Sequence, residues 1–319
     1  LGSTDAKPFA HDGLVYVLHR YLIDALDVLD PDAAWKIVDQ QAIDAPDAAS
    51  ANPQAIAFAE DRAYVTLHAS AELAVFDLTD PRRPRRDEGI SLARLSDADG
   101  SAEPGLAIAC GDHLFVAIQR LDRADGFRPR HDRDAVVAVD RRTGQLHDLD
   151  PAAPGVQPIE LLGRWARQWR RDPDDPSGRA LLVLTTGLER LDLATGTSAW
   201  VVAPALLEAV GVTSYLQPQA FALDRDGVAY IASYTADFRE VQVHRVGWGG
   251  RGPAAPERGL DGLQISEQAL EIIDDTLWIA DRTIGASGLR PYDLRQHPPR
   301  SLPGPLATGL APYALLAAP

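Results

Sequence analysis

Tyr64-Val65-Thr66 is one copy of a short run that occurs six times along the chain. Each copy opens with an aromatic residue or leucine and continues with β-branched or aliphatic residues, as in Tyr16-Val17-Leu18, Tyr64-Val65-Thr66, Phe115-Val116-Ala117, Leu182-Val183-Leu184, Tyr230-Ile231-Ala232 and Trp278-Ile279-Ala280. The openings are 48, 51, 67, 48 and 48 residues apart. A steady period of roughly 40–50 residues with several short strands per unit is typical of β-propeller blades. The spacing therefore predicts an all-β propeller of six blades, each with four antiparallel strands. The long step leaves seven blades as the alternative.

Each unit divides into four strands. The innermost strand is led by proline in several units, for example at Pro53, Pro104 and Pro218. Proline suits the first residue of a strand, where its missing amide donor does no harm. The third strand ends on aspartate in five units, at Asp30, Asp77, Asp140, Asp192 and Asp293. Because an aspartate side chain can bind the backbone of a following turn, these residues predict hairpin turns.

The two ends of the chain suggest how the ring closes. The first unit begins with its second strand, whereas Pro312-Tyr313-Ala314-Leu315-Leu316 matches an innermost strand with nothing after it. We expect this C-terminal strand to pair with the N-terminal blade, which would leave no bare sheet edge. The chain 1–319 would then be a single propeller domain. Its blades are expected at about 11–40 plus 309–318, 52–95, 103–150, 162–202, 216–250 and 265–300.

Composition narrows the function classes. The net charge of −15 disfavours nucleic acid and an anionic membrane surface as partners. Cys110 is the only cysteine, so no internal disulfide can form. No apolar run approaches the roughly 18 residues of a transmembrane segment. The chain contains no methionine and opens on polar residues. We therefore expect a removed targeting segment, export to the periplasm or surface of a bacterium, and membrane attachment only through a lipid anchor outside this chain.

Unit two, Pro53–Thr79, contains Pro-x-Ala-Ile-Ala, Tyr-Val-Thr and Val-Phe-Asp-Leu-Thr. It resembles the YVTN-type propeller repeat of exported and surface-layer proteins, and the likeness extends over essentially the whole chain. A narrower likeness, in Asn52-Pro53-Gln54 and 116–123, is to surface copper-binding propeller proteins of methanotrophs. That resemblance implies copper held by histidines, one of them two residues after an oxidised tryptophan. No tryptophan of this chain has a histidine at that spacing, and position 54 is glutamine.

Polar residues of the innermost strands should converge on the central channel. The candidates are Gln54, Gln219, Gln268 and Tyr313, with Glu103 and Glu267 close by. Amides and a phenol can grip a polar ligand but cannot act as a general base. The alternative is that these side chains bind ordered water and one another.

A second ring of candidates lies at the ends of the second strands, four residues after each opener: Arg20, His68, Gln119, Tyr234 and Arg282. Arginine and histidine at one channel mouth would suit a carboxylate or phosphate group. The alternative is pairing with nearby aspartates. His19, His68 and Asp281 could together bind copper or another metal, because imidazole and carboxylate suit such ions. No other cofactor is expected.

The long insertion 120–133 combines arginines with one aromatic residue, and its candidates for partner binding are Phe127, Arg128, Arg130 and His131. Arginine and aromatic residues are enriched in interface hot spots. The sequence therefore favours a non-enzymatic exported propeller that binds a protein partner or polymer at the cell envelope. The alternatives are a metal-binding surface protein, or an enzyme acting on a sugar, lactone or quinone with Glu103 and Glu267 as its acid–base pair.

Overall fold

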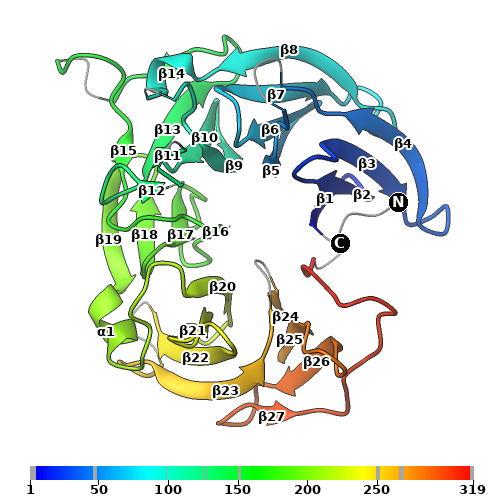
Figure 1. Ribbon diagram of the computed structural model, residues 1–319, viewed down its shortest axis with the longest axis vertical. Coiled ribbons are helices and arrows are strands. Elements are labelled where there is room, and N and C mark those ends of the chain that lie inside the picture. The colour runs from blue at the N-terminus through cyan, green and yellow to red at the C-terminus, as the bar shows by residue number, and fades with distance from the viewer. Residues whose placement is uncertain are drawn as a thin grey trace.

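The chain forms a ring of sheets arranged radially around a common axis (Figure 1). The structure is a computed structural model, and it describes residues 5–45, 49–97, 99–123, 125–126, 128–149, 152–248, 252–265 and 269–316. Within these residues six sheets form the blades, each of four antiparallel strands in sequence order except the third, which adds a fifth strand, and a seventh sheet is a small two-stranded hairpin. The blade count predicted from the 48-residue spacing is confirmed.

The first three blades follow one another in the chain. Blade 1 contains β1 (Ala6–His11), β2 (Leu14–His19), β3 (Ala25–Asp30) and β4 (Lys36–Ala42). Blade 2 contains β5 (Pro53–Ala59), β6 (Arg62–Leu67), β7 (Glu72–Asp77) and β8 (Arg85–Ser91), followed by the short 3₁₀ helix η1 (Ala93–Leu95). Blade 3 contains β9 (Pro104–Cys110), β10 (His113–Ile118), β13 (Ala135–Asp140), β14 (Leu146–His147) and β15 (Ile159–Glu160).

The last three blades complete the ring. Blade 4 contains β16 (Gln168–Arg171), β17 (Ala180–Leu184), β18 (Leu188–Asp192) and β19 (Thr197–Val202), and it is followed by the helix α1 (Pro204–Glu208). Blade 5 contains β20 (Pro218–Leu223), β21 (Val228–Tyr234), β22 (Val241–Gly247) and β23 (Glu257–Leu263). Blade 6 contains β24 (Leu270–Ile273), β25 (Thr276–Asp281), β26 (Gly288–Asp293) and β27 (Arg300–Ser301).

The long step between blades 3 and 4 is not a further blade in the described residues. It holds β15 and a small hairpin, formed by β11 (Leu121–Asp122) and β12 (Arg128–Pro129). Among all the residues that the structure describes, no helix is long and apolar enough to span a bilayer.

The aspartates that end the third strands make the turns predicted for them. Asp140 ends β13, and its Oδ1 accepts the amides of Arg142 at 2.9 Å and Thr143 at 2.8 Å. Gly144 closes the turn at φ 68°, a left-handed conformation that glycine adopts without a Cβ clash.

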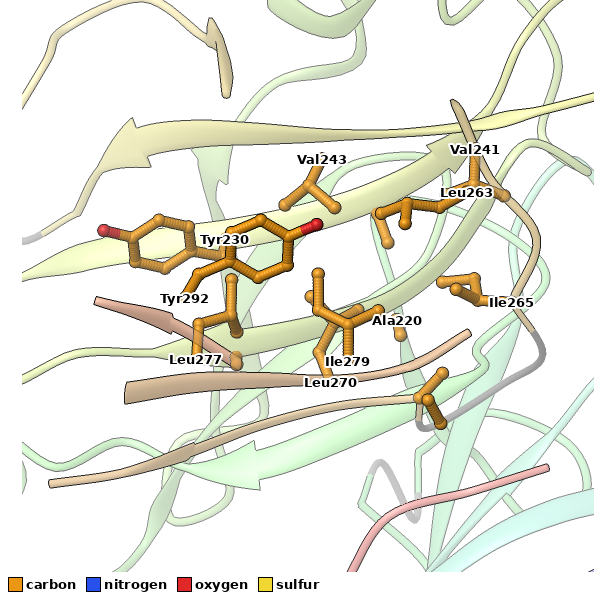
Figure 2. Packing of buried hydrophobic residues seen from close by; sticks show 14 of the residues in the cluster. Ala220, Tyr230, Val241, Val243, Leu263, Ile265, Leu270, Leu277, Ile279 and Tyr292 are labelled. Atoms are coloured by element: carbon orange, nitrogen blue, oxygen red, sulfur yellow. The ribbon is translucent and has the colours of Figure 1, made fainter. Parts of the chain in front are cut away.

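The hydrophobic core lies between neighbouring blades. Figure 2 shows the contact of blades 5 and 6, where Tyr230 and Val243 face Leu277 and Ile279. Five of the six openers of the sequence repeat belong to this core, and Tyr16, Tyr64 and Tyr230 are at most 1% exposed; the sixth, Trp278, is half-buried. Each blade therefore buries both faces of its inner strands, which is why the second strands read as continuous apolar runs.

The predicted mode of ring closure is wrong. Blade 1 has its own innermost strand, β1, which pairs with β2 from Ala6↔His19 to His11↔Leu14. Residues 309–316 form no strand, so the expected blade 11–40 plus 309–318 is replaced by β1–β4. The C-terminal segment instead contacts blade 1 at Arg20, whose Nη2 donates a hydrogen bond of 2.7 Å to the hydroxyl of Tyr313.

Candidate functional site

One backbone hydrogen bond recurs in five blades and shapes one mouth of the channel. A residue at or directly after the end of the second strand donates its amide to a carbonyl that precedes the innermost strand, by one residue in four blades and by six in blade 6. The five pairs are Arg20 to Asp5 at 3.0 Å, His68 to Asn52 at 3.2 Å, Gln119 to Glu103 at 3.2 Å, Tyr234 to Gln217 at 2.9 Å and Arg282 to Gln264 at 2.5 Å. The structure thus places the second ring of candidates, read from the sequence, at equivalent positions of their blades.

A cavity of about 350 Å³ lies at this mouth on the side of blades 1 to 4. Its walls are Asp5, Lys7, Arg20, Tyr21, Asn52, Gln54, His68, Gly105, Leu106, Gln119, Trp165, Ala166 and Arg167. The volume falls in the range of roughly 300–1,000 Å³ of small-molecule sites. The candidates Arg20, Gln54, His68 and Gln119 therefore share one cavity.

Left-handed backbone conformations occur at the same place in three neighbouring blades. Asn52, Glu103 and Trp165 precede the first residues of their inner strands and have φ of 46°, 46° and 64°. Such conformations cost a non-glycine residue about 1–3 kcal/mol and cluster at functional sites. Two carboxyls support them: the half-buried Asp24 accepts the amide of Asn52 at 3.0 Å, and the buried Asp134 accepts that of Ala166, next to Trp165, at 2.7 Å.

The described wall of the cavity carries more positive than negative charge. Lys7, Arg20 and Arg167 face a single carboxylate, that of Asp5. Arg20 is fixed by its neighbours, since it donates to Asp5 Oδ1 and to Gln54 Oε1, each at 2.6 Å. In a chain with a net charge of −15, a positive cavity is a local exception that favours an anionic ligand.

Aromatic and guanidinium groups alternate at the blade 4 side of the mouth. The Arg167 guanidinium lies 5.4 Å from the centre of the Trp165 ring, and Trp165 contacts Tyr215 with ring centres 5.7 Å apart. Arg164 lies 4.1 Å over the other aromatic ring, that of Tyr215. Cation–π contacts of this kind hold Arg167 and Trp165 in place beside the cavity.

The structure does not bring the metal candidates together. His19 Nε2 lies 2.9 Å from Asp27 Oδ2. Asp281 is buried and accepts bonds from Gln264 N at 3.0 Å and Arg290 Nε at 2.5 Å. His68 Nε2 contacts Gln119 Oε1 at 3.2 Å. Among the described residues, no group of three or more potential ligands is arranged to bind a metal ion.

Glu103 is fully buried, outside the cavity wall. Its Oε2 accepts the amide of Leu121 at 2.9 Å, and its Oε1 lies 3.3 Å from Arg123 Nε. Burial raises the pKa of this carboxyl to about 7. Glu267 and Gln268, the proposed acid–base partner and one channel amide, lie outside the described residues.

The other candidates for the channel do not line the cavity, and their side chains contact other partners. Gln219 donates to Leu216 O at 2.7 Å, and Tyr234 donates to Ile265 O at 3.2 Å. Arg282 lies 5.2 Å over the ring of Tyr313. Tyr313 therefore stands between Arg20 of blade 1 and Arg282 of blade 6.

The Arg-rich insertion is a hairpin whose arginines form ion pairs. Arg130 contacts Asp97 at 3.0 Å and Asp122 at 3.1 Å, and Arg128 contacts Asp125 at 3.3 Å in an exposed pair. His131 is exposed. Phe127 lies outside the described residues.

Sequence reasoning missed Asp5, Lys7 and Trp165 as cavity residues. Lys7 stands two residues after Asp5, just as Gln54 stands two after Asn52 and Arg167 two after Trp165. Had β1 been recognised as an innermost strand, this offset would have placed Lys7 at the mouth.

The fold and the cavity define a six-bladed β-propeller with a polar cavity at one mouth of its channel. Among solved structures it is similar to the periplasmic gluconolactonase of Pseudomonas aeruginosa, with 14% identity, coverage of 100% of this chain and 90% of that one, and a TM-score of 0.63. It is also similar to a protein of unknown function from Desulfotomaculum acetoxidans (12% identity, 98% and 88% coverage, TM-score 0.59). A third is a putative 6-phosphogluconolactonase from Bacteroides fragilis (13% identity, 91% and 79% coverage, TM-score 0.56). No protein-family model and no curated protein matches the sequence. These identities show a shared fold alone.

Proposed function

We propose that this protein binds a small polar anion, a carboxylate or phosphate compound, in the cavity at the channel mouth. The observation that carries the proposal is the wall composition: Lys7, Arg20 and Arg167 converge on about 350 Å³ with one carboxylate, that of Asp5, among the described lining residues. Charged hydrogen bonds to an anion are worth more than neutral ones, about 1.5–3 kcal/mol each.

The polar and aromatic groups of the wall suit a ligand with hydroxyls as well as a charge. Gln54 and Gln119 offer amide donors and acceptors, and the Trp165 ring offers an apolar face. Sugar acids and sugar phosphates have this chemistry. Two of the proteins of similar fold are named as lactonases of such compounds, which makes their lactones natural test ligands.

The test is calorimetric titration of the protein with inorganic phosphate and with gluconate. The variants are Lys7→Gln and Arg167→Gln, alone and together. Glutamine already stands at the equivalent positions of blades 2 and 5, as Gln54 and Gln219, so the fold accommodates it. We expect the double variant to bind at least tenfold more weakly, because each substitution removes a charged donor.

Arg179→Gln is the matched control. Arg179 lies in the loop between β16 and β17, at the opposite end of the strands, and the substitution removes the same charge. It should leave the affinity unchanged. If Arg179→Gln weakened anion binding equally, the affinity would depend on the net charge of the protein and not on the cavity. If the unaltered protein bound neither anion, the proposal would be wrong. Incubation with gluconolactone in the same series reports whether binding leads to hydrolysis.

A second candidate function is docking of an envelope protein or polymer through the β11–β12 hairpin. It is favoured by the exposed tip pair, in which the Arg128 and Asp125 side chains are 75% and 63% exposed. Export to the cell envelope belongs to this candidate. Replacing Arg128 and His131 by serine should then abolish co-purification with the partner, whereas the cavity variants should leave it intact.

A further inference from the structure

The turn that follows Arg20 exposes three consecutive apolar side chains beside the cavity. Tyr21, Leu22 and Ile23 are 61%, 66% and 46% exposed. Scattered apolar residues are ordinary on a protein surface, but contiguous ones often mark a binding site.

The turn contains a strained backbone conformation that hydrogen bonds hold in place. Leu22 has φ 69°, a left-handed conformation that a bulky residue rarely adopts. Its amide donates to Ser50 Oγ at 3.0 Å, and Ser50 Oγ donates to Asp24 Oδ1 at 3.0 Å. Asp24 also accepts the amide of Asn52, which lines the cavity. The apolar turn and the cavity wall are therefore fixed by one hydrogen-bond network.

The turn and the cavity form one continuous surface. Tyr21 belongs to both, since it lines the cavity and begins the exposed run. Arg20, directly before it, contributes a buried guanidinium to the same cavity. Leu106 and Trp165 add apolar area to the wall. A single molecule that spans this surface would present an anionic group to Lys7 and Arg167 and an apolar part to Tyr21, Leu22 and Ile23.

We infer that the ligand is an amphiphilic anion, a carboxylate or phosphate that bears an alkyl or acyl chain, with its chain lying on the Tyr21-Leu22-Ile23 turn. This inference rests on the proposed function, because the anionic group occupies the cavity described there. It adds the class of the ligand and a specificity-determining surface.

The experiment is titration with a series of alkyl phosphates, from methyl to octyl, each below its micelle concentration. We expect the dissociation constant to fall about two- to fourfold per added CH₂, the gain that follows from burial of a methylene. In the variant Leu22→Asn/Ile23→Ser, which leaves the cavity wall intact, this dependence on chain length should weaken to about half or less, while methyl phosphate binds as before. Asparagine at position 22 tolerates the left-handed conformation, so the turn keeps its shape.

The control is Ile37→Thr on the outermost strand β4, where Ile37 is 57% exposed and away from the cavity. It should leave the chain-length dependence intact. Binding of methyl phosphate with no dependence on chain length would overturn this inference and leave the proposed function standing. A dependence that survives unchanged in the double variant would also overturn it. Absence of binding along the whole series would contradict both.

Discussion

Arg170 and Glu271 form a bidentate ion pair across the channel. Arg170 lies on the innermost strand of blade 4, and its two terminal nitrogens donate to the two carboxylate oxygens of Glu271, on the innermost strand of blade 6, at 3.1 and 2.9 Å. The Arg170 guanidinium also lies 5.9 Å from the ring centre of Phe221 in blade 5. One side chain thus ties three blades together, and Figure 1 shows that these blades follow one another round the ring.

This ion pair should stabilise the ring measurably. In a double-mutant cycle with Arg170→Gln and Glu271→Gln, we expect a coupling energy of about 1–3 kcal/mol, because the pair is bidentate and largely shielded from water. Urea unfolding of the four proteins measures it. The control is the exposed pair Arg225 and Asp274, 3.6 Å apart, for which a coupling below about 1 kcal/mol is expected. Equal coupling in both pairs would show that the channel position adds nothing.

The C-terminal segment should contribute to stability through the Tyr313 hydroxyl. Tyr313→Phe removes the acceptor of the 2.7 Å bond from Arg20 Nη2 and should lower the free energy of unfolding by about 1–2 kcal/mol. Tyr21→Phe, an exposed tyrosine on the neighbouring turn, is the control and should change it by less than about 0.5 kcal/mol. If the two variants are equally stable, Tyr313 does not link the ends of the ring.

Much of the ring could be predicted from the sequence because it depends on local chemistry. The buried openers recur with the blade period, and Asp30 or Asp140 marks a strand end by binding the turn that follows. The offset of four residues from opener to mouth also follows from regular strand geometry, which is why Arg20 and His68 were found at equivalent positions.

Strand β1 was missed because Pro8 lies in its middle, and proline inside a run argues against a strand. The innermost strand of a propeller faces the channel with one edge, so Pro8 can pair with Val17 without needing its absent amide. The contact of Arg170 with Glu271 joins residues 101 positions apart and leaves no local signal in the sequence.

Glu103 should make stability depend on pH. Burial is the main cause that raises the pKa of this carboxyl from 4.5 to about 7. The charges of Asp99 and Asp97 also raise the pKa, whereas the charge of Arg123 lowers it. Between these values the folded state binds more protons than the unfolded state, so this group lowers the free energy of unfolding as pH rises. Glu103→Gln mimics the protonated acid and should be more stable than the unaltered protein at pH 8, on the order of 2 kcal/mol, but not at pH 4.5.

Urea unfolding at the two pH values tests this expectation. Glu60→Gln, at an exposed carboxyl, is the control and should show no such difference between the two pH values. A Glu103→Gln variant that is destabilised equally at both would contradict a buried carboxyl that titrates near neutrality.

His244 should have the opposite effect at acid pH. It is 1% exposed, and burial, with Arg258 nearby, lowers its pKa from 6.5 to about 4. The unfolded state therefore binds more protons between these values, and this group lowers stability as pH falls through the window. At pH 4.5, His244→Leu should raise the urea concentration at the unfolding midpoint above that of the unaltered protein. This gain should be larger at pH 4.5 than at pH 7. The exposed substitution His131→Asn should shift neither midpoint, and a His244→Leu protein with unchanged acid sensitivity would contradict the assignment.

The most direct measurement is a crystal structure of the protein soaked in sodium arsenate, with data collected at the arsenic absorption edge. Arsenate has the charge and shape of phosphate, and its anomalous signal identifies it without ambiguity. The account predicts an anomalous peak inside the cavity, within hydrogen-bond distance of Lys7 Nζ and the Arg167 guanidinium. Arsenate bound only elsewhere on the surface, with the cavity occupied by water, would contradict it.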